Sequence, residues 1–557
     1  MTFERSDADV DTDVLVVGAG PVGQTLAIAL AQRDVRVHLV ERKDRPAFLP
    51  KMERCNARTM EIFRRLGLHD KVRAATKFVD VPMDVFIVSS LTAPPILRLE
   101  YPSVREAMEQ TLACHDASMP REPYQLISQY TLEPLLKSVV EQLPAATVQF
   151  GCELVSFEQD DAGVTSVLRA ADGAERSVRS RYLVGCDGGS SGVRKALGIP
   201  LQGRGRIAAV HQLFFRAPGL FDRIAPGKGR HYYGPKGALV VQDDLEHFML
   251  NIHQLVEGRS PADEIRAFIG MDLEVEVLHV SSWWQHLLVA ERYRDGQVFL
   301  AGDSNHLYIP TGGLGMNTGA GDAVDLAWKL AAVIAGWGGP DLLASFEAER
   351  RPVGLRNCDA AGMAASALRA WRAFCPPELA DDTPQGAEAR RAVAEAANEH
   401  QRVVHEMINT ELGYRYADSP IVCADPDPVP DPGPMTYEPT TTCGIRLPHV
   451  WLTPGDSVHD HIGDGFTLLR LGGAAADTSA LEAAMIATGA PFAVLTIDDA
   501  RVRRLYERDL ILVRPDLHVV WRGDAPPDNP EEVARVVTGH ADRSRTPVAA
   551  LAVHDQT

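Results

Sequence analysis

The sequence predicts an α/β protein made of several units, and three observations carry this prediction. A Val-rich run over 13–18 leads through closely spaced glycines into a helical pattern and then into a second strand-like run over 35–41. Two further apolar runs, 181–185 and 297–301, lead to an Asp-Gly pair and a Gly-Asp pair. Beyond a proline-rich stretch over 423–435, strand-like and helix-like runs alternate once more. Strands that alternate with helices indicate parallel sheets covered by helices.

Composition limits the number of units and the kinds of partner. The chain of 557 residues is too long for one hydrophobic core, so roughly three or four units are expected. Hydrophobic residues make up 45% and charged residues 24%, which is ordinary for a globular protein. The 75 acidic and 56 basic residues give a formal charge of −19, and no Lys/Arg cluster could neutralise several phosphates. We therefore expect no nucleic-acid partner.

The expected location is cytoplasmic, without a membrane partner. The N-terminal segment is acidic where a signal peptide would be basic and then apolar, and no stretch approaches the roughly 20 apolar residues of a membrane span. The eight cysteines form no CxxC pair and do not lie near two histidines at zinc-ligand spacing. They are interpreted as reduced thiols, and no metal site is expected.

The first motif predicts a dinucleotide site. Gly18, Gly20 and Gly23 follow a strand and open a helix, where they would permit a tight turn and close approach of a pyrophosphate to the helix N-terminus. Glu41 ends the second strand and would accept the hydroxyls of an unphosphorylated ribose, so FAD or NAD fits better than NADP. Its neighbour Arg42 is assigned to the same site. The alternative is a glycine-rich turn that only packs the helix on the strand.

Two later motifs complete a pattern known from one family. Asp187-Gly188 follows the strand-like run 181–185, and Gly302-Asp303 is followed by an H..P.GG.G.N.G run over 306–319. Through about residue 360 the sequence resembles the group A flavoprotein monooxygenases, the aromatic hydroxylases related to para-hydroxybenzoate hydroxylase and phenol hydroxylase. All three motifs occur in the order of that family.

The resemblance implies a fold and its division. It implies a Rossmann-like FAD-binding domain of glutathione-reductase type, interleaved with an α+β substrate domain built on a β-sheet, and a C-terminal thioredoxin-like domain. The expected boundaries are 1–80, 120–200 and 290–360 for the FAD-binding domain, 81–119 and 201–289 for the substrate domain, 361–422 for a helical segment, 423–445 for a proline-rich linker and 446–557 for the thioredoxin-like domain. We expect the helical segment to pack on the FAD-binding domain.

The C-terminal prediction has its own basis. Strand-like runs at 465–472 and 491–498, a helical run between them, a hairpin over 510–523 and a helix from about Pro530 follow in the order of a thioredoxin-like unit. The hairpin region also resembles the C-terminal domain of phenol hydroxylase-type members. Because this region has no CxxC pair, the resemblance implies a role in packing or homodimer formation rather than redox chemistry.

The resemblance also implies cofactor contacts. Asp303 would accept hydrogen bonds from the ribityl chain of FAD, Asp187 would serve both FAD and a passing nicotinamide, and Gln129 would reach the adenosine or pyrophosphate. Pro310 and Gly313 would lie beside the isoalloxazine ring.

The run that follows Gly313 is expected to begin a helix aimed at the flavin. Backbone N–H groups of Gly315, Met316 and Asn317 would face the pyrimidine edge, where reduced flavin is anionic and a helix N-terminus offers free donors. Asn317 and Thr318 are predicted N-cap residues. The histidine of the same motif, His306, is open to a chemical or a loop-anchoring role.

The implied reaction consumes NADH or NADPH as a transient co-substrate together with O₂. It proceeds through a flavin C4a-hydroperoxide that is attacked by a phenolic or other electron-rich aromatic substrate, with no metal. Two alternatives stay open: a flavin-dependent dehydrogenase, oxidase or halogenase on the same fold, and an FAD- or NAD-binding module without chemistry of its own.

Deprotonation of a phenolic substrate needs a base, and three residues are candidates. Glu53 lies where phenol hydroxylase relatives place an acid, with an exposed loop carboxylate as the alternative. His211 lies in an alternating run, where a hydrogen-bonded sheet histidine is equally compatible. Tyr232, with Tyr233 beside it, could donate to a phenolate or serve β-packing. Trp283 could form a pocket wall or lie in the core.

Two departures from the family pattern have no interpretation at this level. Ser304 and Asn305 replace two small apolar residues that many relatives carry after the Gly-Asp pair. Pro50-Lys51-Met52 stands where many relatives have Pro-Arg-Ala, which leaves the role of that arginine open.

Overall fold

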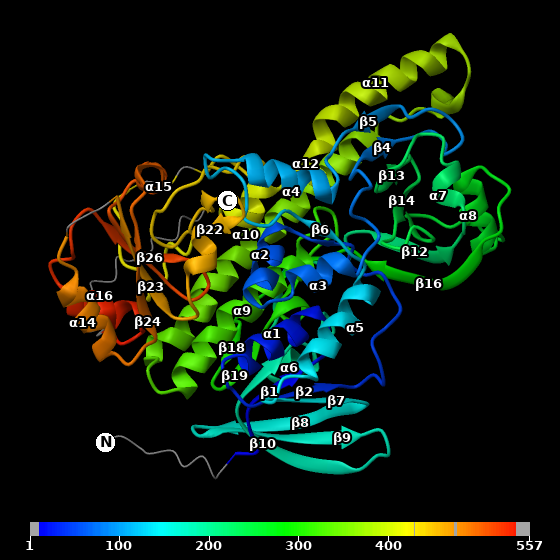
Figure 1. Cartoon of the computed structure of the whole chain (residues 1–557). Coiled ribbons are helices and arrows are strands. Elements are labelled where there is room, and N and C mark those ends of the chain that lie inside the picture. Colours follow the sequence, from blue (N-terminus) through cyan, green and yellow to red (C-terminus); the bar gives the residue numbers. More distant parts are fainter. Residues whose placement is uncertain (1–9, 428, 430, 473–475, 542–557) are drawn as a thin grey trace, which may run out of the picture.

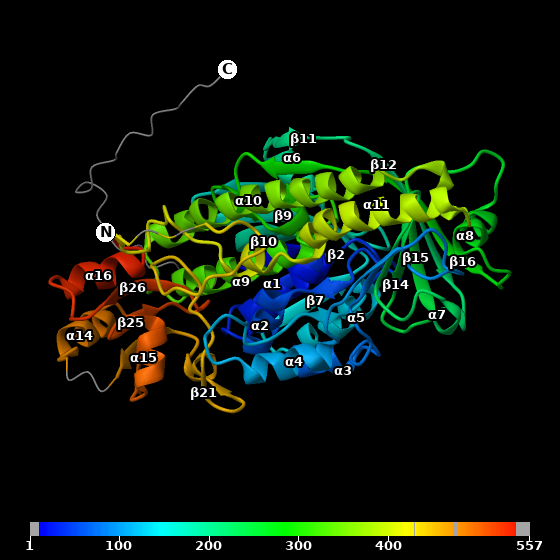
Figure 2. The same ribbon diagram turned by 90° about the horizontal axis from the view of Figure 1, so that it is seen from above.

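The computed structural model describes residues 10–427, 429, 431–472 and 476–541. Figure 1 shows three regions: a central body of blue, cyan and green elements, a green sheet at one end, and a compact orange and red unit at the other. Figure 2 shows that the long helix α10 (Pro340–Arg372) runs along the central body toward the green sheet, and that α11 (Pro384–His400) lies beside the sheet. Within the described ranges, no helix has the length and apolarity that a membrane crossing requires.

The central body is built on a parallel sheet. Its five parallel strands lie in the order β19 (Val298–Leu300), β10 (Glu175–Gly185), β1 (Thr12–Val17), β2 (Val37–Glu41) and β7 (Ala146–Phe150). Every residue of β1 is buried. A strand covered on both faces needs an apolar run rather than an alternating one, which is why the Val-rich run signalled it correctly.

Helices pack against the parallel sheet, and two antiparallel strands extend it. Helix α1 (Pro21–Ala31) packs against α5 (Gln129–Val140) and α9 (Gly315–Ile334). Strands β8 (Cys152–Asp160) and β9 (Gly163–Ala170) form an antiparallel extension with β10. The expected α/β class and strand–glycine–helix–strand unit are therefore confirmed.

The second region is a seven-stranded sheet, mostly antiparallel, whose strands come from two separate parts of the chain. The first part supplies β4 (Val85–Ile87) and β5 (Leu97–Leu99), and the second supplies all the others. Its order is β16 (Glu276–Trp284), β12 (Ala209–Arg216), β15 (His247–Ile252), β14 (Gly237–Val241), β13 (His231–Tyr233), β4 and β5. One face packs against helices α7 (Leu220–Arg223) and α8 (Pro261–Ile269) in a continuous apolar core.

Helix α10 (Pro340–Arg372) joins the two regions. Its 33 residues begin with a proline at the first helical position, which favours helix initiation, and its first part packs against α9. The expected boundary at 360/361 falls inside this helix. Helix α11 (Pro384–His400) follows it.

The expectation that the helical segment packs on the FAD-binding domain holds for only part of it, because Ala361, Ala364 and Ala365 of α10 lie in the core of the central body while the end of α10 and helix α11 pack elsewhere. Trp371 of α10 and Val393 and Ala397 of α11 share a buried cluster with Val85 and Leu99 of the seven-stranded sheet. The helical pattern predicted the helices but not the surface that they cover, because several apolar faces were available.

The C-terminal unit has a four-stranded sheet in the order β24 (Phe492–Ile497), β23 (Phe466–Leu471), β25 (Leu510–Val513) and β26 (Val519–Gly523). Helices α14 (Ser479–Ala487) and α16 (Pro530–Val537) occur where they were expected. Helix α15 (Ala500–Tyr506) lies between two predicted strands, in a run for which no element was predicted. The order of sheet and hairpin agrees with the sequence pattern.

A buried ionic cluster fastens the C-terminal unit to the central body. Arg514 of the hairpin turn donates to Glu349 of α10 at 2.6 Å and to Asp325 of α9 at 3.0 Å. Lys329 lies between the two carboxylates, with its Nζ 2.8 Å from Asp325 and 2.5 Å from Glu349. Charges with this little solvent access are stable only when mutually paired, so the two units have a defined contact rather than a loose one.

Candidate functional site

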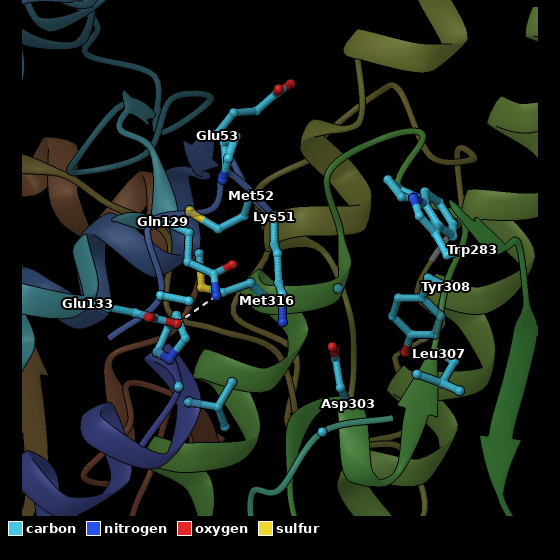
Figure 3. A pocket seen from close by; sticks show the side chains of 18 of the residues that line it. Lys51, Met52, Glu53, Gln129, Glu133, Trp283, Asp303, Leu307, Tyr308 and Met316 are labelled. Carbon is cyan, nitrogen blue, oxygen red and sulfur yellow. Dashed lines mark hydrogen bonds between the residues drawn. The ribbon is translucent and has the colours of Figure 1, made fainter. Parts of the chain in front are cut away.

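One cavity of about 680 Å³ reaches from the glycine turn after β1 to the seven-stranded sheet. Figure 3 shows its interior, with Asp303, Met316 and Gln129 on one side and Trp283 and Tyr308 on another. It is lined by residues from the parallel sheet, from the second sheet and from helices α9, α10 and α12 (Arg402–His405). Residues expected to bind a cofactor and residues of the expected substrate sheet therefore meet in one space.

Two of the three motif glycines have no room for a side chain. Gly18 has a φ of +105°, and a Cβ there would lie 2.4 Å from the carbonyl oxygen of Cys186. A Cβ on Gly23 would lie 2.0 Å from the carbonyl oxygen of Gly18. At Gly20, by contrast, a Cβ would meet no protein atom within 4 Å, so this position is open on the cavity side. The turn forms a cradle whose backbone a ligand can approach closely.

The acid at the end of β2 is tied to the same turn. Glu41 accepts hydrogen bonds from the backbone N–H groups of Ala19 at 2.9 Å and Lys43 at 3.0 Å. Arg42 lines the cavity beside it. Gln129 also lines the cavity, and its amide donates to Glu133 at 2.6 Å, as Figure 3 shows.

The two aspartates of the later motifs both border the cavity. Asp187 accepts from the N–H groups of Gly192 and Val193 with one carboxylate oxygen, while its buried Oδ1 has no partner. Asp303 is accessible from the cavity, and burial in the surrounding protein raises the pKa of its carboxyl against the opposing effects of His306 and Lys51. Both carboxylates have acceptor capacity left for a ligand.

Helix α9 begins at Gly315 beside Asp303, and Leu314 stands at its N-cap without a capping side chain. The prediction of Asn317 or Thr318 as N-cap is therefore wrong, because the chain turns into the helix three residues earlier. Gly315 and Met316 line the cavity, so the first turn presents backbone N–H groups that no side chain caps. Pro310 and Gly313 line the approach to this turn.

Asn317 lines the cavity too, but its side chain serves the protein. The amide oxygen accepts from the backbone N–H of Asn56 at 2.9 Å and from the hydroxyl of Thr59 at 2.7 Å. Its amide nitrogen donates to the carbonyls of Arg54 and Gly313. The side chain thus holds the glycine loop against helix α2 (Ala57–Arg65), and only the backbone of Asn317 is free for a ligand.

The polar pair after Asp303, unexplained from the sequence, has a structural role. Ser304 donates to the carbonyl of Gly185 at 2.6 Å, and Asn305 donates to the carbonyl of Leu300 at 3.1 Å. Both residues are fully buried. Small apolar residues could not make these bonds, so Ser304 and Asn305 tie the Gly-Asp turn to the ends of β10 and β19.

His306 anchors the same turn. Its Nε2 lies 3.1 Å from Asp322, which also accepts from the N–H of Gly302 at 3.1 Å and from Arg350 at 2.8 Å. Burial favours a higher pKa for Asp322, but Arg350 and His306 outweigh it and lower the pKa to about 2. Of the two roles open for His306, loop anchoring fits its burial, because it does not border the cavity.

The second sheet turns one face toward the cavity. Because side chains alternate along a strand, Val210 and Gln212 of β12 face the cavity together with their neighbours Trp283 of β16 and Asn251 of β15. Trp283 is therefore part of the wall, as Figure 3 shows, and not of the core.

Two catalytic candidates lie on the face of this sheet that points away from the cavity. His211 stands between Val210 and Gln212 and points to the other face, where its Nδ1 lies 2.7 Å from the hydroxyl of Ser282. Tyr232 is fully buried in the core of that other face, and its hydroxyl donates to the carbonyl of Gly227 at 2.7 Å. Neither borders the cavity, so both predictions of a catalytic role are wrong.

Glu53 does line the cavity, and its partner was missed by the sequence analysis. Its Oε1 lies 2.7 Å from Nε2 of the buried His231, and its backbone carbonyl accepts from Arg230 at 2.8 Å. Burial acts to raise the pKa of Glu53, but His231 and Arg230 prevail and lower it to about 2. Glu53 is thus an ionised, paired carboxylate and not a solvated loop residue.

The cavity residues that the sequence analysis missed include His231, Arg372 of α10 and His405 of α12. The sequence held a weak signal for the first, since His231 and Tyr233 alternate with Tyr232 in one short strand, but which set faces the cavity depends on the packing. Arg372 and His405 come from the helical segment that was expected to pack elsewhere.

The residues of the cradle fit a flavin dinucleotide. The glycine turn leaves its backbone open to close approach by a pyrophosphate. Asp187 has an unpartnered acceptor oxygen, and the uncapped N-terminus of α9 offers N–H donors. Ribityl, pyrophosphate and flavin groups need acceptors and donors of this kind. Within the described part of the chain, no group of three or more His, Cys, Asp and Glu residues could hold a metal ion. Fold and site together define a dinucleotide-dependent enzyme whose cofactor cradle opens into a substrate cavity.

Comparisons with known proteins give the family. Residues 11–238 and 260–361 match the FAD binding domain family, and residues 440–542 match the aromatic-ring hydroxylase C-terminal family. The chain belongs to the FAD-dependent aromatic-ring monooxygenases, the group A flavoprotein family that its motifs resemble. The expectations of an FAD cofactor and a monooxygenase fold are confirmed.

Curated relatives cover nearly the whole chain. The FAD-dependent monooxygenase apdD of Emericella nidulans is 33% identical over 94% of this chain and 89% of its own length. Aklavinone 12-hydroxylase RdmE of Streptomyces purpurascens is 34% identical over 93% of this chain and 96% of its own.

Two solved structures have the same architecture. RebC with bound 7-carboxy-K252c is 35% identical, with a TM-score of 0.87 over 95% of this chain and 99% of that one. The flavin-dependent monooxygenase PieE in complex with FAD and substrate is 30% identical, with a TM-score of 0.85 over 96% of this chain and 100% of that one.

Proposed function

We propose that this monooxygenase hydroxylates a phenolic or other electron-rich aromatic compound, with NADH or NADPH as electron donor and O₂ as the source of the oxygen. The observation that carries the proposal is the single cavity that joins the glycine cradle and Asp303 to the Glu53–His231 pair. Reduced FAD, when bound, supplies the activation of O₂. The remaining tasks fall to the side chains of this chain.

Those side chains orient the aromatic ring and keep water out. Met249, Val240 and Trp283 supply apolar wall, while Gln212 and Asn251 supply polar groups from the same face of the sheet. The amide of Gln212 donates to Asn251 at 3.0 Å, which fixes both side chains. Apolar walls with a few fixed polar groups are typical of ligand sites that hold a substrate in one orientation.

The proton of the substrate hydroxyl is assigned to His231. Glu53, with a pKa lowered to about 2, is a poor base at neutral pH. It instead holds the imidazole by its Nε2, while Nδ1 of His231 has no partner. A carboxylate that orients an imidazole leaves the second ring nitrogen, here the buried and unpartnered Nδ1, as the acceptor, so we assign Glu53 as a positioning residue and His231 as the proton acceptor.

The test combines oxygen tracing with two variants. Flavin-loaded protein should oxidise NADH or NADPH faster with the right phenol, and the product should gain one oxygen atom from labelled O₂. His231→Gln should lower the hydroxylation rate about a hundredfold at unchanged FAD content, because general base catalysis is worth about 10² to 10⁴. Glu53→Gln should shift the pH profile of hydroxylation, since it leaves the imidazole without its counter-charge.

His211→Gln is the matched control, because His211 lies in the same sheet but on the face away from the cavity. Accelerated NAD(P)H oxidation without label in any product would favour an oxidase or dehydrogenase. Equal rates in His231→Gln and His211→Gln would show that His231 takes no proton.

Three expectations stay predictions of this proposal. They are the transient docking of the nicotinamide, a thioredoxin-like C-terminal domain that serves packing or homodimer formation, and a cytoplasmic location. The order of elements in the C-terminal unit supports the second, and sedimentation of the flavin-loaded protein would test for the homodimer.

A further inference from the structure

Arg372 is a cavity residue for which the proposed reaction has no use. It lies in the last turn of α10, and it borders the substrate end of the cavity together with Leu368 of the same helix and Tyr233 and Ala238 of the sheet. Its guanidinium lies over the ring of Tyr233, 5.8 Å from the ring centroid. The residue is therefore placed where an aromatic substrate would meet it.

The guanidinium of Arg372 has few bonds. Its Nη2 donates to the carbonyl of Gly237 at 2.9 Å, and its buried Nε has no partner. In the described part of the chain, no Asp or Glu carboxylate forms an ion pair with it, and the titratable groups that act on it are Tyr233 and Cys375. Four of its five N–H donors thus have no acceptor in the described part of the protein, and a neutral carbonyl does not balance its charge.

Two other arginines of the same cavity, Arg54 and Arg230, are paired with carboxylates. Arg54 lies 2.8 Å from Glu411, and Arg230 lies 3.7 Å from Glu53. The contrast matters because all three cations border one cavity of a protein that carries 75 acidic residues. The lack of a carboxylate beside Arg372 is a local feature and does not reflect a shortage of acids.

An arginine keeps its charge at any physiological pH, so Arg372 cannot avoid the cost of an unpaired charge by losing a proton. Burial lowers the pKa of Arg372, with Tyr233 and Cys375 acting in the opposite direction. Burial also raises the pKa of Tyr233 and of Cys375, so both groups are neutral at pH 7. A half-buried cation without an anion is unfavourable unless a ligand supplies the anion.

We propose that Arg372 binds a carboxylate carried by the aromatic substrate, so that the enzyme acts on acidic rather than neutral aromatic compounds. The inference rests on the proposed hydroxylation of an aromatic compound in this cavity. The planar guanidinium matches a carboxylate through two parallel hydrogen bonds. The two terminal nitrogens are the donors for this, because Nε is enclosed by protein and Nη2 gives only one of its N–H groups to Gly237. One cation without a second beside it suits a singly charged group better than a phosphate.

The test uses two probes of nearly the same size and shape, 6-hydroxy-2-naphthoate, which is an anion, and 6-hydroxy-2-naphthamide, which is neutral. Each is titrated into the oxidised, FAD-loaded protein without NAD(P)H, and binding is read from the change in flavin absorbance. Wild-type protein should bind the naphthoate about tenfold more tightly or better, because a charge-assisted hydrogen bond outweighs a neutral one. Arg372→Gln should reduce this preference to less than about twofold while leaving the affinity for the naphthamide unchanged.

Two further variants keep the result interpretable. Arg372→Lys retains the positive charge and should retain part of the preference, which separates loss of charge from loss of packing. Arg369→Gln removes an exposed arginine one turn earlier on the same helix and should leave the preference intact.

Equal binding of the two probes by wild-type protein would overturn the proposal, as would a preference that survives in Arg372→Gln. An equal loss for both probes in that variant would also overturn it, since the cation would then serve the hydroxyl or the wall. No binding of the naphthoate at millimolar concentration counts against it as well. Because no turnover is involved, each of these results is distinct from a failure of hydroxylation.

Discussion

The two ends of the cavity recognise their ligands by different means. The cofactor end is built from backbone: the turn at Gly18 to Gly23 and the first turn of α9 offer N–H groups and closeness of approach. The substrate end is built from side chains, such as Trp283, His231 and Arg372, that stand on three different elements. Recognition by the backbone restricts which residue types can stand at successive positions of the turn. A wall of side chains restricts only which residues the fold brings together from distant positions.

This difference also appears in sequence separation. Glu41 contacts the glycine turn from 22 residues away, within one strand–helix–strand unit. Glu53 and His231 are 178 residues apart, and the two residues come within 2.7 Å only because strand β13 of the second sheet lies against the segment that precedes Arg54. The first contact lies within one local unit, while the second depends on how distant segments pack.

The largest expected effect concerns the support of the cradle. Asp322→Asn should lower the free energy of unfolding by about 3 to 5 kcal/mol at pH 7, because it leaves the buried cation of Arg350 unpaired. It should also loosen FAD, since Asp322 holds the N–H of Gly302. Denaturant unfolding and flavin content measure the two effects, and Asp359→Asn, an exposed acid on α10, is the control.

The same variant makes a pH prediction. The pKa of Asp322 is lowered from its ordinary 3.8 to about 2, so its ionised form stabilises the fold. That contribution is complete above pH 3.8 and is lost as the pH falls through about 2. The stability difference between wild type and Asp322→Asn should therefore shrink over this window, and a difference independent of pH would show that the ion pair is not its source.

The next largest effect concerns the cofactor end of the cavity alone. Gly23→Ala should weaken FAD binding by about a hundredfold, because the new Cβ would overlap the carbonyl oxygen of Gly18, and a backbone atom of the turn cannot move aside. Flavin retained after gel filtration measures this. Gly463→Ala, whose Cβ would meet no atom within 4 Å, should retain wild-type flavin content. Full retention in Gly23→Ala would mean that the turn is not the cradle.

The smallest effect separates the two faces of the substrate sheet. Tyr232→Phe should cost about 1 kcal/mol of stability through its lost bond to Gly227, with hydroxylation changed less than twofold. Tyr233→Phe, one residue along and facing the cavity, should instead change KM. Steady-state kinetics and thermal unfolding of the pair measure this contrast, and a larger kinetic effect at Tyr232 would reverse the assignment of the faces.

Errors in prediction follow the same division. The strand–glycine–helix units and their order were predicted correctly, because each depends on residues next to one another. His211 and Tyr232 were wrong for one reason: alternation shows that neighbours face opposite sides, but not which side is the cavity. Ser304 and Asn305 could not be interpreted, since their acceptors, the carbonyls of Gly185 and Leu300, are unrelated to any sequence spacing.

By itself the sequence determined the cofactor and the class of chemistry. The cofactor site has local requirements that few residue types satisfy: no side chain at Gly18 and Gly23, an acid at the end of the second strand, and a glycine-rich entry to a helix. Only the tertiary structure decided the substrate end. In the folded protein, α10 extends past the central body to the second sheet, and this places Arg372 in the cavity. The burial of apolar faces drives such contacts between distant segments, and the hydrophobic periodicity of a helix does not show which segment it will contact.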